Sequence, residues 1–224
     1  MDYEKLKTKN LYPDLSHTLA KGLLEKTEYP WLALEELKSF IIAVGKALPE
    51  DEFTPIDDNF WIGRGVSISP TAELNGPAII DSGTVIRPGA FIRGSVIVGE
   101  NCVIGNSTEL KNCIIFDSCQ VPHFNYVGDS ILGFKAHMGA GAVTSNVKSD
   151  KTPVTINFNG EKIETGRKKV GAFLGEGVEV GCNSVLNPGT IIGANSSVYP
   201  LSSVRGYVPE NSIFKGEKGI FKKA

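Results

Sequence analysis

The stretch from residue 62 to residue 110 decides the fold: IGRGVSISPTAELNGPAIIDSGTVIRPGAFIRGSVIVGENCVIGNSTEL. Every sixth position in it is a branched aliphatic residue: Ile62, Ile68, Leu74, Ile80, Ile86, Ile92, Val98, Ile104 and Leu110. From Val66 onward, the residue two places before each aliphatic is small or β-branched. This period does not fit a helix, because six residues drift around an axis of 3.6 residues per turn. It also lacks the turn spacing of a simple meander.

A period of six fits a prism with three flat sides. Each side is a short strand in which alternate side chains point inward, and glycine or proline lies at the corners between strands. Three hexads make one coil, and coils stack as parallel strands about 4.8 Å apart. The pattern continues through Ile115, Val121, Val127, Leu132, Met138 and Thr144, with two five-residue steps, and then resumes from Leu174 to Val204. A β-sandwich with coincidental spacing is the alternative.

The flanking segments lack the hexad pattern. Residues 1–58 show helical spacing of leucines and an apolar stripe after Pro30, so we expect a helical N-terminal cap. It would cover the open end of a β-helix at 59–208, or bind a partner, or gate a substrate. The tail, 209–224, is basic, and we interpret it as an extension that crosses to another surface or subunit.

A segment at 145–169 interrupts the repeats. Residues 154–165 alternate around Asn159-Gly160, which predicts a hairpin projecting from one corner of the prism. The segment has an excess of lysine and arginine, which indicates either a solvated face or phosphate binding.

Composition sets limits on the class of protein. The chain has 224 residues and a formal net charge of −2, which gives no support for a nucleic-acid or membrane-surface partner. Its apolar runs fall short of the roughly 18 residues that a spanning helix needs. Met1–Asn10 is charged throughout and does not resemble a signal peptide, so we expect a cytoplasmic location. Cys102 and Cys119 occupy small inward positions, which favours packing over disulfide or metal binding.

Two of the three histidines, His123 and His137, lie within the repeats, where inward positions are otherwise aliphatic. Histidine is the side chain best suited to accept a proton near neutral pH, although a histidine in such a strand is more often structural. The surrounding motifs favour a catalytic role. They are Arg-Pro-Gly-Ala at 87–90, Gly-Asn at 105–106, His-x-x-Tyr-Val-Gly-Asp at 123–129, Gly-Ala-Gly at 139–141 and Thr-x-Asn at 144–146.

With these motifs, residues 60–208 resemble the acetyltransferase domain of bifunctional N-acetylglucosamine-1-phosphate uridylyltransferase/glucosamine-1-phosphate acetyltransferase. The resemblance implies a left-handed β-helix, acetyl-CoA as co-substrate, no metal requirement, and a homotrimer with coenzyme A between two prisms. It assigns His123 as general base and Asn146 as the residue that orients the amine and acetyl group. It places the sugar phosphate on Arg87, Lys111, Tyr126, His137 and Lys169, and coenzyme A near Ala140 and Cys182, with the Ala140 N–H facing the thioester oxygen.

Two departures from the family bear on function. The family has asparagine where this chain has His137, which affects substrate identity more than acyl transfer. Residues 1–58 are also too short for a nucleotidyltransferase domain and have no Gly-rich phosphate-binding start. The favoured hypothesis is an acetyl-CoA-dependent N-acetyltransferase acting on an amino-sugar phosphate such as glucosamine-1-phosphate, in UDP-N-acetylglucosamine biosynthesis. The alternatives are a non-catalytic oligomerisation or regulatory module, and a zinc hydratase of the γ-carbonic-anhydrase type.

Overall fold

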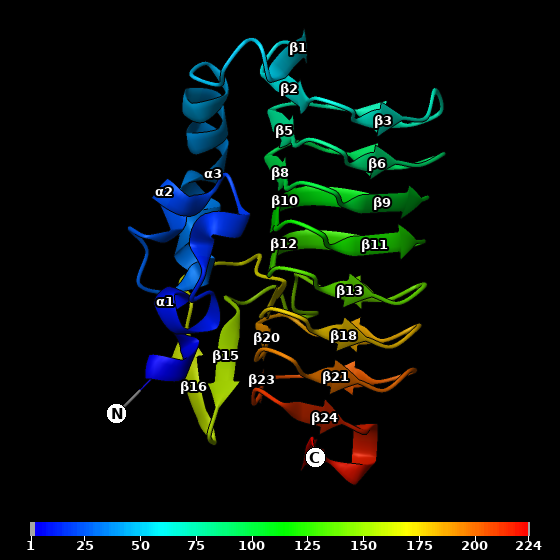
Figure 1. Cartoon of the computed structure of the whole chain (residues 1–224). Coiled ribbons are helices and arrows are strands. Elements are labelled where there is room, and N and C mark those ends of the chain that lie inside the picture. The colour runs from blue at the N-terminus through cyan, green and yellow to red at the C-terminus, as the bar shows by residue number, and fades with distance from the viewer. Residues whose placement is uncertain (1–2, 224) are drawn as a thin grey trace.

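The computed structural model describes residues 3–223 and confirms the fold class (Figure 1). The chain forms a mainly β, left-handed parallel β-helix, preceded by short helices. The inward aliphatic residues stack in register from coil to coil, as in Ile80 beside Val98 and Ile86 beside Ile104. Hexad spacing was sufficient to predict this frame because each strand is defined by its own two inward positions.

The three faces of the prism are built from successive strands. The first face consists of β2 (Phe60–Gly63), β5 (Ala78–Ile80), β8 (Val96–Val98), the ends of β10 (Glu109–Ile115) and β12 (Tyr126–Leu132), β17 (Ala172–Leu174), β20 (Thr190–Ile192) and β23 (Tyr207–Val208). The second consists of β3 (Ser67–Ile68), β6 (Val85–Ile86), β9 (Val103–Asn106), β11 (Gln120–His123), β13 (His137–Met138), β18 (Glu179–Val180), β21 (Ser197–Val198) and β24 (Ser212–Phe214). The third consists of β4 (Glu73–Leu74), β7 (Phe91–Ile92), the beginnings of β10 and β12, β14 (Val143–Thr144), β19 (Val185–Leu186) and β22 (Ser203–Val204).

The two five-residue steps in the sequence mark the strands that turn a corner. β10 and β12 each run from the third face onto the first without interruption. Asn112 and Asp129 make this turn with φ of 48° and 49°, in the left-handed region. The shortened corner therefore places Asp129 between two faces of the prism.

The N-terminal helices lie along the side of the prism, which corrects the prediction that they cap its open end. They are η1 (Glu4–Leu6), α1 (Thr8–Leu11), η2 (Leu15–His17), α2 (Lys21–Leu24) and α3 (Pro30–Gly45). α3 packs against β5, β8, β10 and β12 of the first face (Figure 1). Side chains that point outward from this face are apolar and buried, including Ile79, Ile97 and Ile114, so a helix is needed to cover them.

The hairpin β15 (Thr155–Phe158) and β16 (Glu161–Glu164) turns at Asn159-Gly160, with φ of 50° and 84°. It does not project as predicted. Val154, Ile156 and Phe158 are buried, and the Phe158 ring lies 5.0 Å from the Tyr207 ring of β23. The hairpin therefore covers the lower coils of the face that α3 covers higher up (Figure 1).

Antiparallel strands lie at both ends of the prism. β1 (Phe53–Asp57) pairs with β2 at the first coil, and β25 (Ile220–Lys222) pairs with β24 at the last. A third 3-10 helix, η3 (Gly216–Lys218), joins β24 to β25. The β-helix thus extends past residue 208 into the predicted tail, which folds back on the last coil. Within residues 3–223, no helix has the length and apolar character of a membrane span.

Candidate functional site

His123 ends β11 at the corner between the second and third faces, where its side chain is exposed. The corner is rigid because Asn125, which is buried, bonds on both sides of it. The His123 N–H donates to the Asn125 side-chain oxygen at 3.0 Å, and the Asn125 Nδ2 donates to the carbonyls of Gly139 and Ala142 at 2.8 and 2.9 Å. The base predicted from sequence therefore stands on a fixed backbone.

Ala140 lies beside His123 on the next coil. This follows from the strand register, because Gln120 pairs with His137, and His123 and Ala140 each come three residues after that pair. The Gly141 N–H donates to the His123 carbonyl at 2.9 Å. Within the described residues, no acceptor is found for the Ala140 N–H. The corner thus combines an exposed imidazole with a free backbone donor, the two groups that acyl transfer requires.

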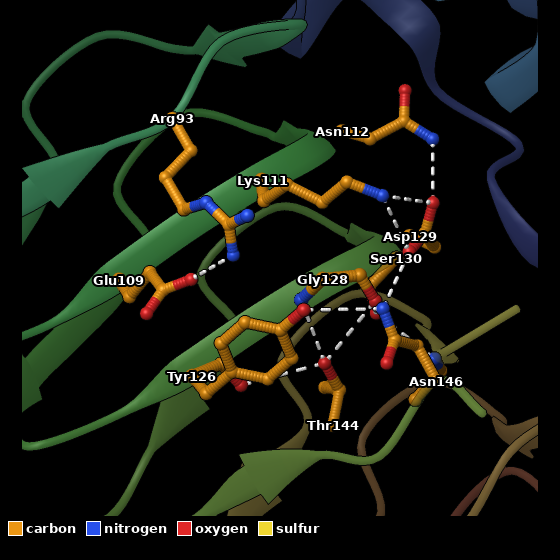
Figure 2. Close-up of polar contacts among 11 residues, drawn as sticks. Arg93, Glu109, Lys111, Asn112, Tyr126, Gly128, Asp129, Ser130, Thr144 and Asn146 are labelled. Atoms are coloured by element: carbon orange, nitrogen blue, oxygen red, sulfur yellow. Dashed lines mark hydrogen bonds and ion pairs between the residues drawn. The ribbon is translucent and has the colours of Figure 1, made fainter. Parts of the chain in front are cut away.

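Asp129 is the centre of a polar cluster at the corner between the third and first faces (Figure 2). Its carboxylate accepts two contacts from Lys111 Nζ, both at 3.0 Å, and one from Asn112 Nδ2 at 2.8 Å. It also accepts from Asn146 Nδ2 at 2.5 Å. The structure therefore brings together two of the predicted site residues, Lys111 and Asn146, around an acid to which the sequence analysis gave no role.

Tyr126 joins this cluster through its hydroxyl oxygen, which accepts from Asn146 Nδ2 at 3.1 Å (Figure 2). Its ring lies over Gly128, where a Cβ atom would collide with it. Burial raises the pKa of Tyr126, and the charge of Asp129 raises it further, so the phenol stays protonated at neutral pH. Beside it, Arg93 and Glu109 form an ion pair at 2.6 Å.

His137 is not part of this cluster. It pairs in register with Gln120, at the opposite end of β11 from His123. Its Nδ1 lies 2.7 Å from a carboxylate oxygen of Glu179, in a surface hollow that Lys135 also lines. The structure therefore separates His137 from His123, although the resemblance assigns both residues to one site.

The remaining predicted residues lie around the two clusters. Arg87 follows β6 and is half-buried. Lys169 is exposed and precedes Val170, whose N–H donates to the Asn146 carbonyl at 3.0 Å. Cys182 is an exposed free thiol on the coil after Ala140, whose carbonyl accepts from the Asn183 N–H at 2.8 Å. Among residues 3–223 no three His, Cys, Asp or Glu side chains are arranged to hold a metal ion.

Sequence reasoning missed the residues that organise the site. Asp129 and Asn125 lie inside the quoted motif, yet nothing in a linear motif shows which neighbouring coil a side chain contacts. The signal that could have identified Asp129 is the five-residue step that follows Val127, because a shortened corner is a special backbone position.

The fold and these motifs define the class as a hexapeptide-repeat β-helix. The model of the GMPPB C-terminal domain family matches residues 74–194, which is more than half of the chain, and the chain belongs to this family.

Relatives with established names confirm the resemblance to bifunctional enzymes. The bifunctional sugar-1-phosphate nucleotidylyltransferase/acetyltransferase of Sulfurisphaera tokodaii is 38% identical over 111 residues, which is 50% of this chain and 28% of the relative. The bifunctional protein GlmU of Methanococcus vannielii is 38% identical over 120 residues, covering 53% of this chain and 29% of the relative. The chain therefore matches less than a third of the length of either relative.

Among solved structures, a mutant of AntD, an N-acyltransferase from Bacillus cereus in complex with dTDP and coenzyme A, has a TM-score of 0.42 and 18% identity. The alignment covers 72% of this chain and 84% of that one.

Proposed function

We propose that this chain transfers an acetyl group from acetyl-CoA to the amine of an amino-sugar phosphate such as glucosamine-1-phosphate. The observation that carries the proposal is the corner at which an exposed His123 lies beside the free N–H of Ala140. The Sulfurisphaera relative, whose name includes an acetyltransferase activity, supports the same reaction class.

The reaction follows from the positions of these two groups. The amine nitrogen attacks the thioester carbonyl carbon, and His123 takes the proton that the nitrogen loses. The Ala140 N–H donates to the oxygen that becomes negative in the tetrahedral intermediate. The C–S bond then breaks, and His123 returns its proton to the departing thiolate, so that an amide and free coenzyme A are formed.

The polar side chains around the corner have separate tasks in this proposal. Arg87 and Lys169 hold the phosphate, because no ion pair engages either of them within residues 3–223. Tyr126 and Asn146 contact the sugar and its amine. Lys111, which is already paired with Asp129, borders the sugar. His137, paired with Glu179 on the second face, contributes to substrate binding.

Coenzyme A is proposed to extend from Ala140 past Cys182 toward the later coils. Two faces of the prism and the His123 corner are left uncovered by α3 and the hairpin. We propose that a second copy lies there, in a homotrimer whose cleft holds the coenzyme, and that the enzyme acts in the cytoplasm.

A substitution of His123 tests the function. His123→Ala should lower kcat for acetyl transfer by about 10²–10⁴-fold, the usual contribution of a general base. Gln120→Ala, an exposed residue at the other end of β11, is the matched control and should retain wild-type turnover. Free thiol released from acetyl-CoA gives the rate. Equal turnover in His123→Ala and the wild type would refute the role of this residue.

One observation favours the alternative of a non-catalytic module. Within residues 3–223, the His123 ring has no hydrogen-bonding or ionic partner to orient it. The carboxylate of Glu109 does not serve as that partner, because it is paired with Arg93. A thermal-shift titration separates the two functions. A melting temperature that rises with coenzyme A supports the enzyme, whereas one that does not change supports the module.

A further inference from the structure

The chemistry of a carboxylate fixes the orientation of the Asn146 amide. Asp129 is nearly buried, with 3% of its side chain exposed, and an ionised carboxylate can only accept hydrogen bonds. The Asn146 atom that lies 2.5 Å from it must therefore be the nitrogen. The same nitrogen reaches the Tyr126 oxygen at 3.1 Å (Figure 2). The side-chain oxygen of Asn146, Oδ1, is consequently turned away from both groups, and no donor within residues 3–223 is bonded to it.

The backbone at Asp129 does not itself require an aspartate. Its φ is 49°, and it is the sole aspartate with positive φ in residues 3–223. Asparagine fills comparable corners at Asn101, Asn112 and Asn183, because it tolerates left-handed backbone without introducing a charge. A buried charge at this corner is costly unless it is paired, and Lys111, Asn112 and Asn146 all donate to it. The carboxylate therefore organises three side chains in addition to forming the turn.

The charges on this face are compensated within the chain. Asp129 neutralises Lys111, and Glu109 neutralises Arg93 at 2.6 Å. Two of the described groups in this cluster can bind a ligand. The Asn146 oxygen can accept, and the Tyr126 hydroxyl can donate, because its own oxygen already accepts from Asn146. An uncharged acceptor next to an uncharged donor binds an uncharged part of a ligand in which a hydrogen-bond donor lies next to a hydrogen-bond acceptor.

We propose that Asp129 is a positioning residue that sets the side-chain oxygen of Asn146, Oδ1, toward the acyl acceptor. This inference rests on the proposed acetyl transfer. The acceptor amine donates an N–H to Asn146, which directs the nitrogen lone pair away from Asn146 and toward the thioester. A neighbouring oxygen of the sugar accepts from Tyr126. The specificity of this face is thus for an amine flanked by a hydroxyl or ether oxygen.

Asp129→Asn tests the inference with minimal change of shape. Asparagine suits the left-handed corner, but its amide can donate as well as accept, so it no longer dictates which Asn146 atom faces the acceptor. We expect kcat/KM for the amine to fall by about 10–100-fold, as for a misplaced reacting group, while the KM for acetyl-CoA stays unchanged. Asp81→Asn is the matched control, because Asp81 is also buried but lies far along the prism from this cluster. An unchanged kcat/KM in Asp129→Asn would overturn the inference.

A double-mutant cycle separates positioning from a general effect on folding. If Asp129 acts through Asn146, then Asp129→Asn should cause no further loss of kcat/KM in the Asn146→Ala background. A loss of the same size in both backgrounds would show that Asp129 acts independently of Asn146, which overturns the inference.

A spectroscopic readout keeps the test independent of turnover. The Asn146 side-chain amide protons should give a strongly shifted pair of NMR signals in the wild type, since one bonds a buried carboxylate. Asp129→Asn should remove that shift, and identical signals in both proteins would overturn the assigned orientation. If the wild type acetylates no amine while this shift is present and lost as expected, the proposed function fails but the Asp129–Asn146 contact stands.

Discussion

The Ala140 backbone has the most specific role at the residue scale, because the proposal depends on one N–H group. The register between coils places Ala140 at the same corner position as Pro88 and Pro200. This corner therefore accepts proline, which has no N–H to donate. Such a position allows the donor to be deleted without a change of fold.

We expect Ala140→Pro to lower kcat by about 10²–10³-fold, the cost of losing one oxyanion donor. Cys182→Pro, at the same corner one coil later, should keep kcat and alter only the KM for acetyl-CoA, because its N–H lies along the proposed coenzyme path but does not face the thioester carbonyl. Steady-state kinetics give the rates, and urea unfolding checks that both variants remain folded. Wild-type turnover by Ala140→Pro would exclude this N–H from catalysis.

Asp81 provides a prediction about pH and stability. Burial raises the pKa of its carboxyl, and the charges of Glu100 and Asp117 act in the same direction, while the Ser82 N–H opposes the shift. An acid whose folded pKa is raised gives stability that is full below the unfolded pKa and is lost as pH rises through the folded pKa. Asp81→Asn removes this loss of stability, because asparagine does not ionise. The urea midpoint of the variant should exceed that of the wild type at pH 7 and equal it at about pH 3, below the unfolded aspartate pKa. A lower midpoint at pH 7 would contradict this account.

At the scale of elements, the sequence predicted the coils but not what covers them. Each coil is specified locally by inward residues and corners, so a hexad count was enough. The position of α3 depends on outward residues such as Ile79, Ile97 and Ile114, which recur once per coil rather than once per hexad. This longer period was present in the sequence and predicts a covered face, because outward side chains on a solvated face are usually polar.

The small inward positions also do more than fill space. Thr84 donates its hydroxyl to the Gly99 carbonyl at 2.8 Å, and Cys102 donates its thiol to the Phe116 carbonyl at 3.1 Å. These bonds satisfy buried carbonyls at the corners, which water does not reach. Packing was the predicted role for Cys102, and the structure adds a donor function to it.

Removing contact between α3 and the prism should be costly. Ile114→Ala leaves a cavity in a fully buried layer and should lower the free energy of unfolding by about 2–5 kcal/mol. Val85→Ala, on the uncovered second face with 37% exposure, should change it by less than about 1 kcal/mol. Urea unfolding measures both variants. Equal costs would mean that α3 does not protect the first face in solution.

The candidate site was predictable to the extent that linear motifs name residues. His123, Tyr126 and Asn146 all come from such motifs, and the structure places Tyr126 and Asn146 in contact. The pairing of Lys111 with Asp129 was not predictable, since it joins neighbouring coils across a shortened corner. The separation of His137 from His123 was predictable, because His123 follows the inward Val121 by two residues whereas His137 immediately precedes the inward Met138.

At the scale of the whole molecule, the unpaired edges of the prism are managed at both ends. β1 and β25 are antiparallel additions that complete the first and last coils, so stacking does not continue indefinitely. With one face covered as well, the second and third faces and the corner between them are left for other copies. The proposed homotrimer should therefore have three times the 24.1 kDa mass of the chain by light scattering. A monomer at assay concentration would remove the proposed cleft for coenzyme A.

Acetyl transfer itself is the central claim, and matched acceptors test it most directly. Release of free thiol from acetyl-CoA should accelerate with glucosamine-1-phosphate, and mass spectrometry should locate the acetyl group on its nitrogen. Glucose-1-phosphate, which lacks the amine, should leave the rate at background. Thiol release that is equal with both sugars, or absent with every amino-sugar phosphate offered, would contradict the account.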